Sequence, residues 1–320
     1  MAALMKLLTK NQHIDVLSRH EDNNAAAEVY AAAMKQPVTR QNVAYWRRIF
    51  LESGSKAKAN NLLVEHRVLR QPEPGDDVGD TSWVPDMARR IMVIGDMHFP
   101  YQHPDIDAFL AHVDAEYNPD LHVQIGDETD GHALSFHESD PNLDSAGVEL
   151  EKAKEGLERI HAAFPRLLIC HSNHGSLVYR RAKYSGIPIQ MIKSYREILF
   201  PTHNAPGWSW AFNWRINTPT GPVLFRHQTS GAALDAAAAE GCHLVVGHEH
   251  GKFGAQWGAT SMRLFFGAYT GCLIDKDSLA YAYGKVFPRK PIIGVLMIIE
   301  GVPVNIPMIM GEDGRWIGPQ

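Results

Sequence analysis

Histidine, aspartate and asparagine side chains recur at five points of this 320-residue sequence, each directly after a short, mostly apolar segment. The polar segments are, in order, Gly95–His98, Gly126–Asp130, His171–His174, Arg226–His227 and Gly247–His250. Of the 17 histidines, 14 lie between His98 and His250. Because neutral imidazole is the commonest protein ligand for metals, this clustering indicates a metal site.

The spacing of the donors predicts two metal ions. Asp96 and His98 are two residues apart, as are His248 and His250, and such pairs project to the same side of an extended chain. The glycine before each pair allows a sharp turn of the backbone. Together the segments offer too many ligands for one tetrahedral ion and about enough for two. Two ions about 3.5–4 Å apart clamp a phosphoryl group and supply a metal-bound hydroxide at neutral pH.

The five segments that precede these polar residues are expected to be strands that bring them together. They are Ile91–Ile94, Leu121–Ile125, Leu167–Cys170, Val223–Phe225 and Leu244–Val246. Helical periodicity separates them, at Ile106–Val113, Ala146–Phe164 and Ala232–Glu240. This alternation predicts an α/β fold with helices on the faces of a sheet. Since open α/β sheets gather ligands at the carboxyl ends of their strands, the polar segments should meet in one crevice.

The order GDMH, GDETD, NH, an isolated His and GHEH resembles the calcineurin-like metallophosphoesterase family over about residues 90–255. The resemblance implies a β-sandwich core flanked by helices and a dinuclear site. It implies a first set of ligands, namely Asp96, His98 and His250, and a second set, namely Asn173, His227 and His248, with Asp127 bridging the two ions. It also implies that His174 protonates the leaving oxygen or steadies the phosphate, and that Asp130 orients the His174 imidazole.

Two positions depart from the family pattern. Ser172 stands before the Asn-His pair where the family has glycine, which leaves the ligand and the acid in place. Gly131 stands where the serine/threonine protein phosphatase branch has an arginine. Losing that phosphate clamp argues against protein dephosphorylation. Arg180 and Arg181, just after the Asn-His pair, are candidates to bind phosphate instead.

Residues 1–52 are predicted to form a small helical module that resembles a helix-turn-helix. Asn23 or Asn24 is expected to cap a helix over Ala25–Met34, and Thr39 to cap one over Arg40–Leu51. In a DNA-binding helix of this kind four side chains would face the groove and two would meet phosphates: Thr39, Arg40, Gln41 and Tyr45, then Arg47 and Arg48. The alternative is a helical hairpin with a solvated basic face.

Charge and composition give the remaining organisation. Residues 1–70 carry a net charge of +5 and the other 250 residues a net charge of −10. A linker or docking segment is expected over residues 53–88, and the metallophosphoesterase domain over 89–320. No apolar run of about 18 residues is present, so no membrane span is expected. Three isolated cysteines favour neither disulfides nor a thiolate zinc site and fit a reducing, cytoplasmic setting.

The sequence therefore favours a dinuclear-metal-dependent phosphodiesterase or nuclease that acts on DNA. Oxygen and imidazole donors without sulfur suit manganese, which we expect, or iron or zinc. A phosphomonoesterase acting on proteins or nucleotides is one alternative, because the acidic body is a poor track for polyanions. A DNA-binding regulator with a structural phosphoesterase body is the other.

Overall fold

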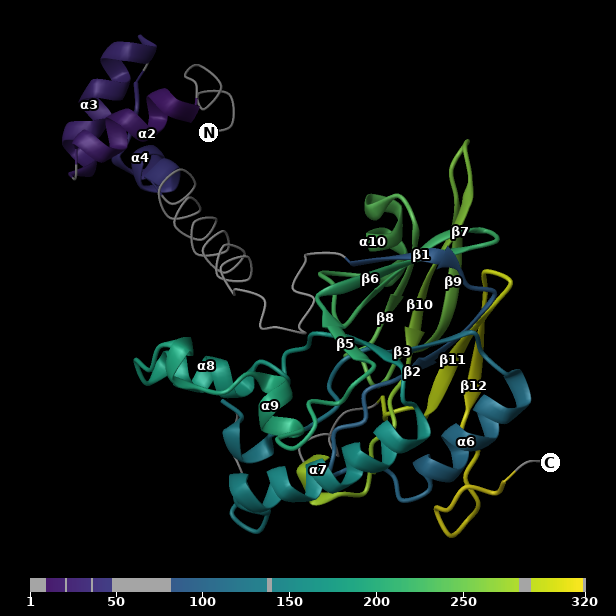
Figure 1. Cartoon of the computed structure of the whole chain (residues 1–320). Helices are drawn as coiled ribbons and strands as arrows, with labels where there is room; N and C mark the ends of the chain where they lie inside the picture. The colour runs from purple at the N-terminus through teal and green to yellow at the C-terminus, as the bar shows by residue number, and fades with distance from the viewer. Residues whose placement is uncertain are drawn as a thin grey trace. The chain divides into compact units, whose positions relative to one another are not determined.

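The structure is a computed structural model that describes residues 10–20, 22–35, 37–47, 82–136, 140–281 and 289–318. The chain divides into two compact units, Met1–Gln71 and Pro72–Gln320, each considered by itself below (Figure 1). Among the helices in these described ranges, none is both long and apolar enough to cross a lipid bilayer.

The N-terminal unit contains three described helices, α2 (Lys10–Arg19), α3 (Asn23–Met34) and α4 (Arg40–Arg47). They enclose a small apolar core made of Leu17, Ala26, Ala27, Tyr30, Met34, Val43 and Trp46. Helix α3 is capped by the Asp22 carboxylate, which accepts hydrogen bonds from the amides of Asn24 and Ala25. The cap is therefore neither of the two predicted asparagines. The expected cap of α4 is confirmed, since Thr39 Oγ1 accepts from the Asn42 amide at 3.2 Å.

The second unit contains two six-stranded sheets, with strand orders β12-β11-β2-β3-β4-β5 and β1-β6-β7-β8-β10-β9. The strands are β1 (Ser82–Met87), β2 (Arg90–Ile94), β3 (Leu121–Gln124), β4 (Leu167–Cys170), β5 (Trp208–Ala211), β6 (Asn213–Thr218), β7 (Gly221–Arg226), β8 (His243–Val246), β9 (Phe253–Ala259), β10 (Leu264–Thr270), β11 (Gly294–Ile299) and β12 (Val302–Pro307). Strand β1, inside the segment predicted to link or dock, pairs with β6.

The sheets pack face to face with helices outside them, which confirms the predicted α/β class and its sandwich core. Strand β2 shows why: alternate side chains point to opposite faces. Ile91 and Val93 join the core between the two sheets, whereas Met92 and Ile94 join the core beneath the helices. The helices of this unit are α6 (Ile106–Tyr117), α7 (Ala146–Ala163), α8 (Leu177–Tyr184), α9 (Tyr195–Leu199) and α10 (Ala233–Glu240), with 3₁₀ turns η2 (His132–Leu134) and η3 (Ile189–Met191).

Each outer face has its own helices. Apolar residues of α6, α7 and α9 pack on the sheet that contains β2, and those of α10 pack on the sheet that contains β8. Strands β2, β3 and β4 run parallel to one another in the first sheet. Strands β7 and β8 run parallel in the second. The polar segments after these five strands therefore come from both halves of the sandwich.

Candidate metal centre

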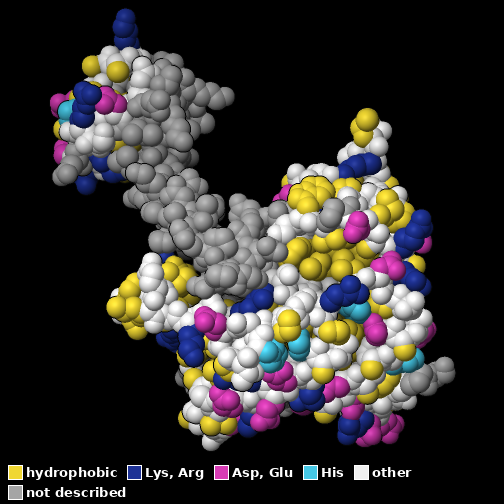
Figure 2. Space-filling view, viewed as in Figure 1, with side chains coloured by type: hydrophobic (Ala, Val, Ile, Leu, Met, Phe, Trp, Pro, Cys, Tyr) yellow, Lys and Arg dark blue, Asp and Glu magenta, His cyan; other side chains and the backbone are white. Residues whose placement is uncertain are grey.

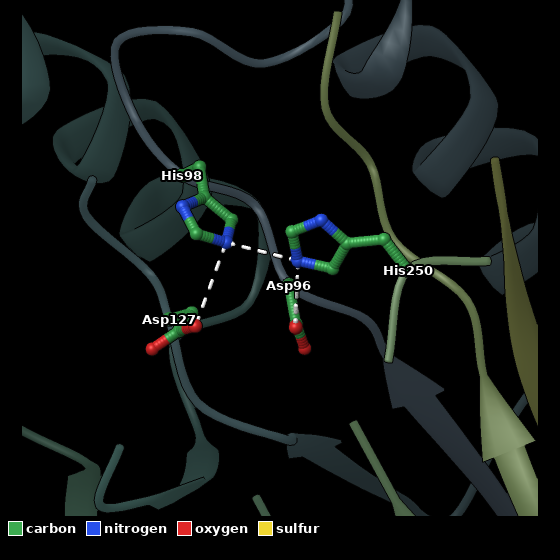
Figure 3. Close-up of side chains that lie close together, drawn as sticks. All are labelled: Asp96, His98, Asp127 and His250. Carbon is green, nitrogen blue, oxygen red and sulfur yellow. Dashed lines mark hydrogen bonds and ion pairs between the residues drawn. The ribbon is translucent and has the colours of Figure 1, made fainter. Parts of the chain in front are cut away.

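The predicted ligands converge in two clusters that share one carboxylate. The first contains Asp96, His98, Asp127 and His250, with ligand atoms that all lie within 4.8 Å of one another. In Figure 3 the rings of His98 and His250 point toward each other, with their Nε2 atoms 3.2 Å apart. His250 Nε2 also lies 3.1 Å from Asp96 Oδ2. Nitrogen and oxygen donors that face one common point are arranged to bind a cation.

The second cluster contains Asp127, His227 and His248, again within 4.8 Å. His227 Nε2 lies 3.2 Å from Asp127 Oδ2 and 2.7 Å from Asn173 Oδ1. The rings of His227 and His248 stand 5.1 Å apart. The structure thus brings together both predicted ligand sets, with Asp127 between them, while their binding of metal stays a prediction.

Three buried aspartates give this region its charge. Asp96, Asp127 and Asp130 are at most 4% exposed. In the described part of the chain their ion-pair partners are histidines, and neither lysine nor arginine pairs with them. Asp96 Oδ1 is buried and makes no hydrogen bond. Since a buried charge needs a compensating partner, this donor set fits divalent cations.

The backbone is strained where the ligands sit. His98, Asp127 and His248 adopt the left-handed region, with φ values of 52°, 55° and 65°. Non-glycine residues rarely do so, and such conformations gather at functional sites. Gly247 is needed for a different reason, because a Cβ there would lie 2.5 Å from Asp96 Oδ1. Unfavourable backbone conformations at these three residues therefore accompany the close approach of their side chains.

The pKa shifts follow from the same charges. Burial alone would lower the pKa of His227, but the Asp127 carboxylate outweighs burial and raises that pKa to about 9. Burial likewise opposes ionisation of Asp127, yet His227 and His174 hold its pKa well below the usual range. His227 donates through Nδ1 to the Ile125 carbonyl at 3.1 Å, which directs its Nε2 toward the oxygens of Asp127 and Asn173. An unprotonated Nε2 beside these oxygens can bind a cation.

Asp130 forms hydrogen bonds with two histidines through different atoms. Its carboxylate accepts from His98 Nδ1 at 2.7 Å, which directs His98 Nε2 toward the first cluster. Its main-chain carbonyl accepts from His174 Nδ1. His174 Nε2 then faces Asp127 Oδ2 at 4.0 Å. Although burial opposes it, Asp127 and then Asp130 raise the pKa of His174. The sequence indicated only the second of the two partners of Asp130.

Two contributors have no signal in the sequence. Tyr281 is buried, and its ring lies 5.9 Å from that of His98 and 6.5 Å from that of His250. The Ile125 carbonyl orients His227 through the main chain. Neither could be found from residue type, because an isolated tyrosine and a carbonyl oxygen occur in any sequence.

The two candidate phosphate-binding arginines differ in their surroundings. Arg181 donates to the carbonyls of Leu134 and Ser135, so its guanidinium is committed to holding the chain near η2. Arg180 is exposed and donates to the Asn173 carbonyl at 3.2 Å. Contact of either residue with phosphate remains a prediction, and Arg180 is the one with solvent access.

The predicted DNA-contacting residues lie in the N-terminal unit. Thr39, Arg40 and Gln41 are exposed at the start of α4. Arg47 instead donates to Asn23 Oδ1 and to the carbonyls of Leu17 and His20, which ties α4 to the other helices. The side chain of Tyr45, and Arg48, lie outside the described residues.

Similarity to known proteins is confined to distant solved structures. No family model and no curated protein matches the sequence. Vps29 from Chaetomium thermophilum is 15% identical over 72% of this chain and 93% of its own, with a TM-score of 0.36. YfcE, a phosphoesterase from E. coli, is 13% identical over 72% of this chain and 97% of its own, with a TM-score of 0.36. Vps29 from Cryptosporidium parvum is 14% identical over 69% and 97%, with a TM-score of 0.35.

Proposed function

We propose that this chain is a dinuclear-metal-dependent phosphoesterase that hydrolyses phosphodiesters, with DNA as its substrate. One observation carries the proposal: two ligand clusters share the Asp127 carboxylate at the ends of strands from both sheets. Three buried aspartates there are paired only with histidines among the described residues. Two divalent ions bound there would supply Lewis acidity at phosphorus and a nucleophile at neutral pH.

The residues of the chain do the positioning and the proton transfer. Asp130 holds His174 by its carbonyl, so that Nδ1 is protonated and Nε2 faces the centre. Asp127 and Asp130 raise the pKa of His174, and its Nε2, which faces the centre, is placed to give a proton to the leaving oxygen. The Asp130 carboxylate meanwhile fixes the ring of His98. Protonation of the leaving group and orientation of a ligand thus depend on one aspartate.

The choice of metal and substrate rests on chemistry. The donors are carboxylate, amide and imidazole groups, while all three cysteines are buried and free, which favours manganese over softer ions. The net charge of +5 on residues 1–70 and the exposed Arg40 and Gln41 support DNA as the substrate. A base-contacting role for α4 remains part of this proposal.

The test combines metal analysis with two small substrates. Metal-depleted protein is reloaded with Mn²⁺, bound metal is counted, and kcat/KM is compared on bis(p-nitrophenyl) phosphate and p-nitrophenyl phosphate. We expect two bound ions and preference for the diester, with nicking of supercoiled plasmid DNA. Hydrolysis of the monoester alone would make the chain a phosphomonoesterase. Two bound ions without hydrolysis of either ester would overturn the proposal.

A further inference from the structure

A basic segment contains the predicted ligand Asn173 near its start. Residues 172–196 contain five lysines and arginines and neither aspartate nor glutamate, although residues 71–320 as a whole carry a net charge of −10. Helix α8 lies within this segment and begins three residues after His174. Local positive charge on an acidic body attracts a polyanion to that place.

Exposed apolar side chains accompany these charges. Tyr184 is 80% exposed, Met191 77%, Phe136 44% and Ile187 43%. Figure 2 shows hydrophobic side chains gathered over the projecting region of α8. Exposed apolar groups rimmed by charge are typical of binding surfaces. We name this region the α8 surface, defined as Phe136, Arg180, Lys183, Tyr184, Ile187 and Met191.

Arg181 supports the aromatic pair of the α8 surface, which is Phe136 and Tyr184. Arg181 donates to the Leu134 carbonyl at 2.6 Å, and its guanidinium lies 4.2 Å from the centre of the Phe136 ring. The Phe136 ring meets that of Tyr184 edge to face, 5.9 Å between centres. Phe136 therefore supports one side of Tyr184, whose ring is otherwise open to solvent.

The length of α8 suits a short single strand of nucleic acid. Eight helical residues make α8 about 12 Å long. That length corresponds to about three or four nucleotides stacked at about 3.4 Å each. Arg180 joins the two regions, because it is exposed on α8 and donates to the carbonyl of Asn173.

We propose that the α8 surface binds an unpaired stretch of nucleic acid, with a base stacked on Tyr184 and phosphates at Arg180 and Lys183. Aromatic rings interleaved with basic side chains are the usual platform for single strands. The choice of nucleic acid as the ligand rests on the function proposed above. A surface of this kind would limit the substrates to nucleic acids with single-stranded segments. An anionic membrane would also suit basic and apolar groups, but an edge-supported aromatic ring beside a phosphoester centre favours a strand.

The test measures binding without metal, so it is independent of hydrolysis. The full chain in EDTA is titrated into a fluorescein-labelled 12-residue oligothymidylate, and into a 12-base-pair duplex, by fluorescence anisotropy. Variants Tyr184→Ala, Tyr184→Phe and Lys183→Ala are compared with wild type. The control is Arg166→Ala, an exposed arginine before β4, at the opposite end of that strand from Asn173.

Tyr184→Ala should raise the Kd for the single strand at least about fivefold, while Tyr184→Phe retains binding and duplex affinity is unchanged. Lys183→Ala should flatten the plot of log affinity against log salt by about 0.7, as one lost phosphate contact requires. No change in Tyr184→Ala, or an equal loss for duplex, would overturn the proposal. So would a Tyr184-dependent affinity for phosphatidylserine vesicles alone. A chain that binds the strand but hydrolyses no ester with Mn²⁺ would refute the proposed function and leave this surface standing.

Discussion

Replacing Asp127 by asparagine should abolish most of the stabilisation that metal gives to the fold. Asp127 is 1% exposed and belongs to both ligand clusters. At a Mn²⁺ concentration of about 100 times Kd, each ion stabilises the folded state by about 2.7 kcal/mol. Two ions should therefore raise the Tm of a unit of this size by about 10–20 °C.

The Asp127→Asn variant removes the shared negative charge. A loss of about 100-fold in affinity at each cluster is a minimum, since even outer-shell partners are worth 10- to 100-fold. At the same Mn²⁺ concentration each ion would then contribute about 0.4 kcal/mol, and the rise in Tm would shrink to about 2–3 °C.

Differential scanning fluorimetry with EDTA or Mn²⁺ measures this shift for each variant against its own metal-free state. Asp120→Asn is the matched control, because Asp120 accepts from the amides of Arg89 and Arg90, away from both clusters. Asp120→Asn should lower the Tm of the metal-free protein, but its Tm should rise with Mn²⁺ by as much as that of wild type. A full Mn²⁺ shift in Asp127→Asn would show that Asp127 does not bridge the ions.

Three further changes test separate parts of the structure. His174→Gln should lower kcat on the diester by about 10²- to 10⁴-fold with Mn²⁺ content unchanged, and loss of the metal instead would make His174 a ligand. Gly247→Ala places a Cβ 2.5 Å from Asp96 Oδ1, so bound Mn²⁺ should fall from two equivalents toward one by metal analysis, and two retained equivalents would contradict the packing argument. Asp105→Asn removes the carboxylate charge and one of the two oxygens that accept from Arg315 and the Trp316 amide, and the hydrogen bond with Arg315 holds the pKa of Asp105 below its usual value. A carboxyl group with a depressed pKa stabilises the fold above about pH 4, and this stabilisation is lost as the pH falls. The variant should therefore have a lower free energy of unfolding in urea than wild type at pH 7, and the difference should be smaller at pH 3. A deficit that grows toward pH 3 would reverse that sign.

The strands that lead to the centre could be predicted because their signal is local. Strand β4 was expected and observed at Leu167–Cys170, and β2 begins one residue earlier than expected, at Arg90. Each of these two strands has four consecutive apolar residues before a polar segment, a pattern that indicates a buried strand wherever it pairs. The polar segments themselves are defined by residue type, and the family resemblance could therefore assign two candidate ligand sets by position. Those side chains lie together in the structure, while their binding of metal stays a prediction.

Pairing and main-chain contacts could not be predicted, because they depend on residues distant in sequence. Ser82–Met87 lies in a segment predicted to link or dock, yet it forms β1 because β6 offers it a parallel edge. The cap of α3 is Asp22 rather than Asn23 or Asn24, since only the Asp22 carboxylate reaches the free amides. Arg47 donates to the carbonyls of Leu17 and His20, contacts that residue type could not predict, and its predicted contact with phosphate stays a prediction.

The candidate centre lies where the ends of strands from the two sheets meet. The same residues that could bind metal also destabilise the metal-free fold there. The first cluster combines Asp96, after β2, with His250, after β8, and the second combines Asp127, after β3, with His227, after β7. Each ion would therefore be bound by ligands from opposite halves of the sandwich. Without cations, buried carboxylates and left-handed residues destabilise that edge. Bound cations would offset this cost, and the stability of this edge would then depend on the metals that the proposed reaction requires.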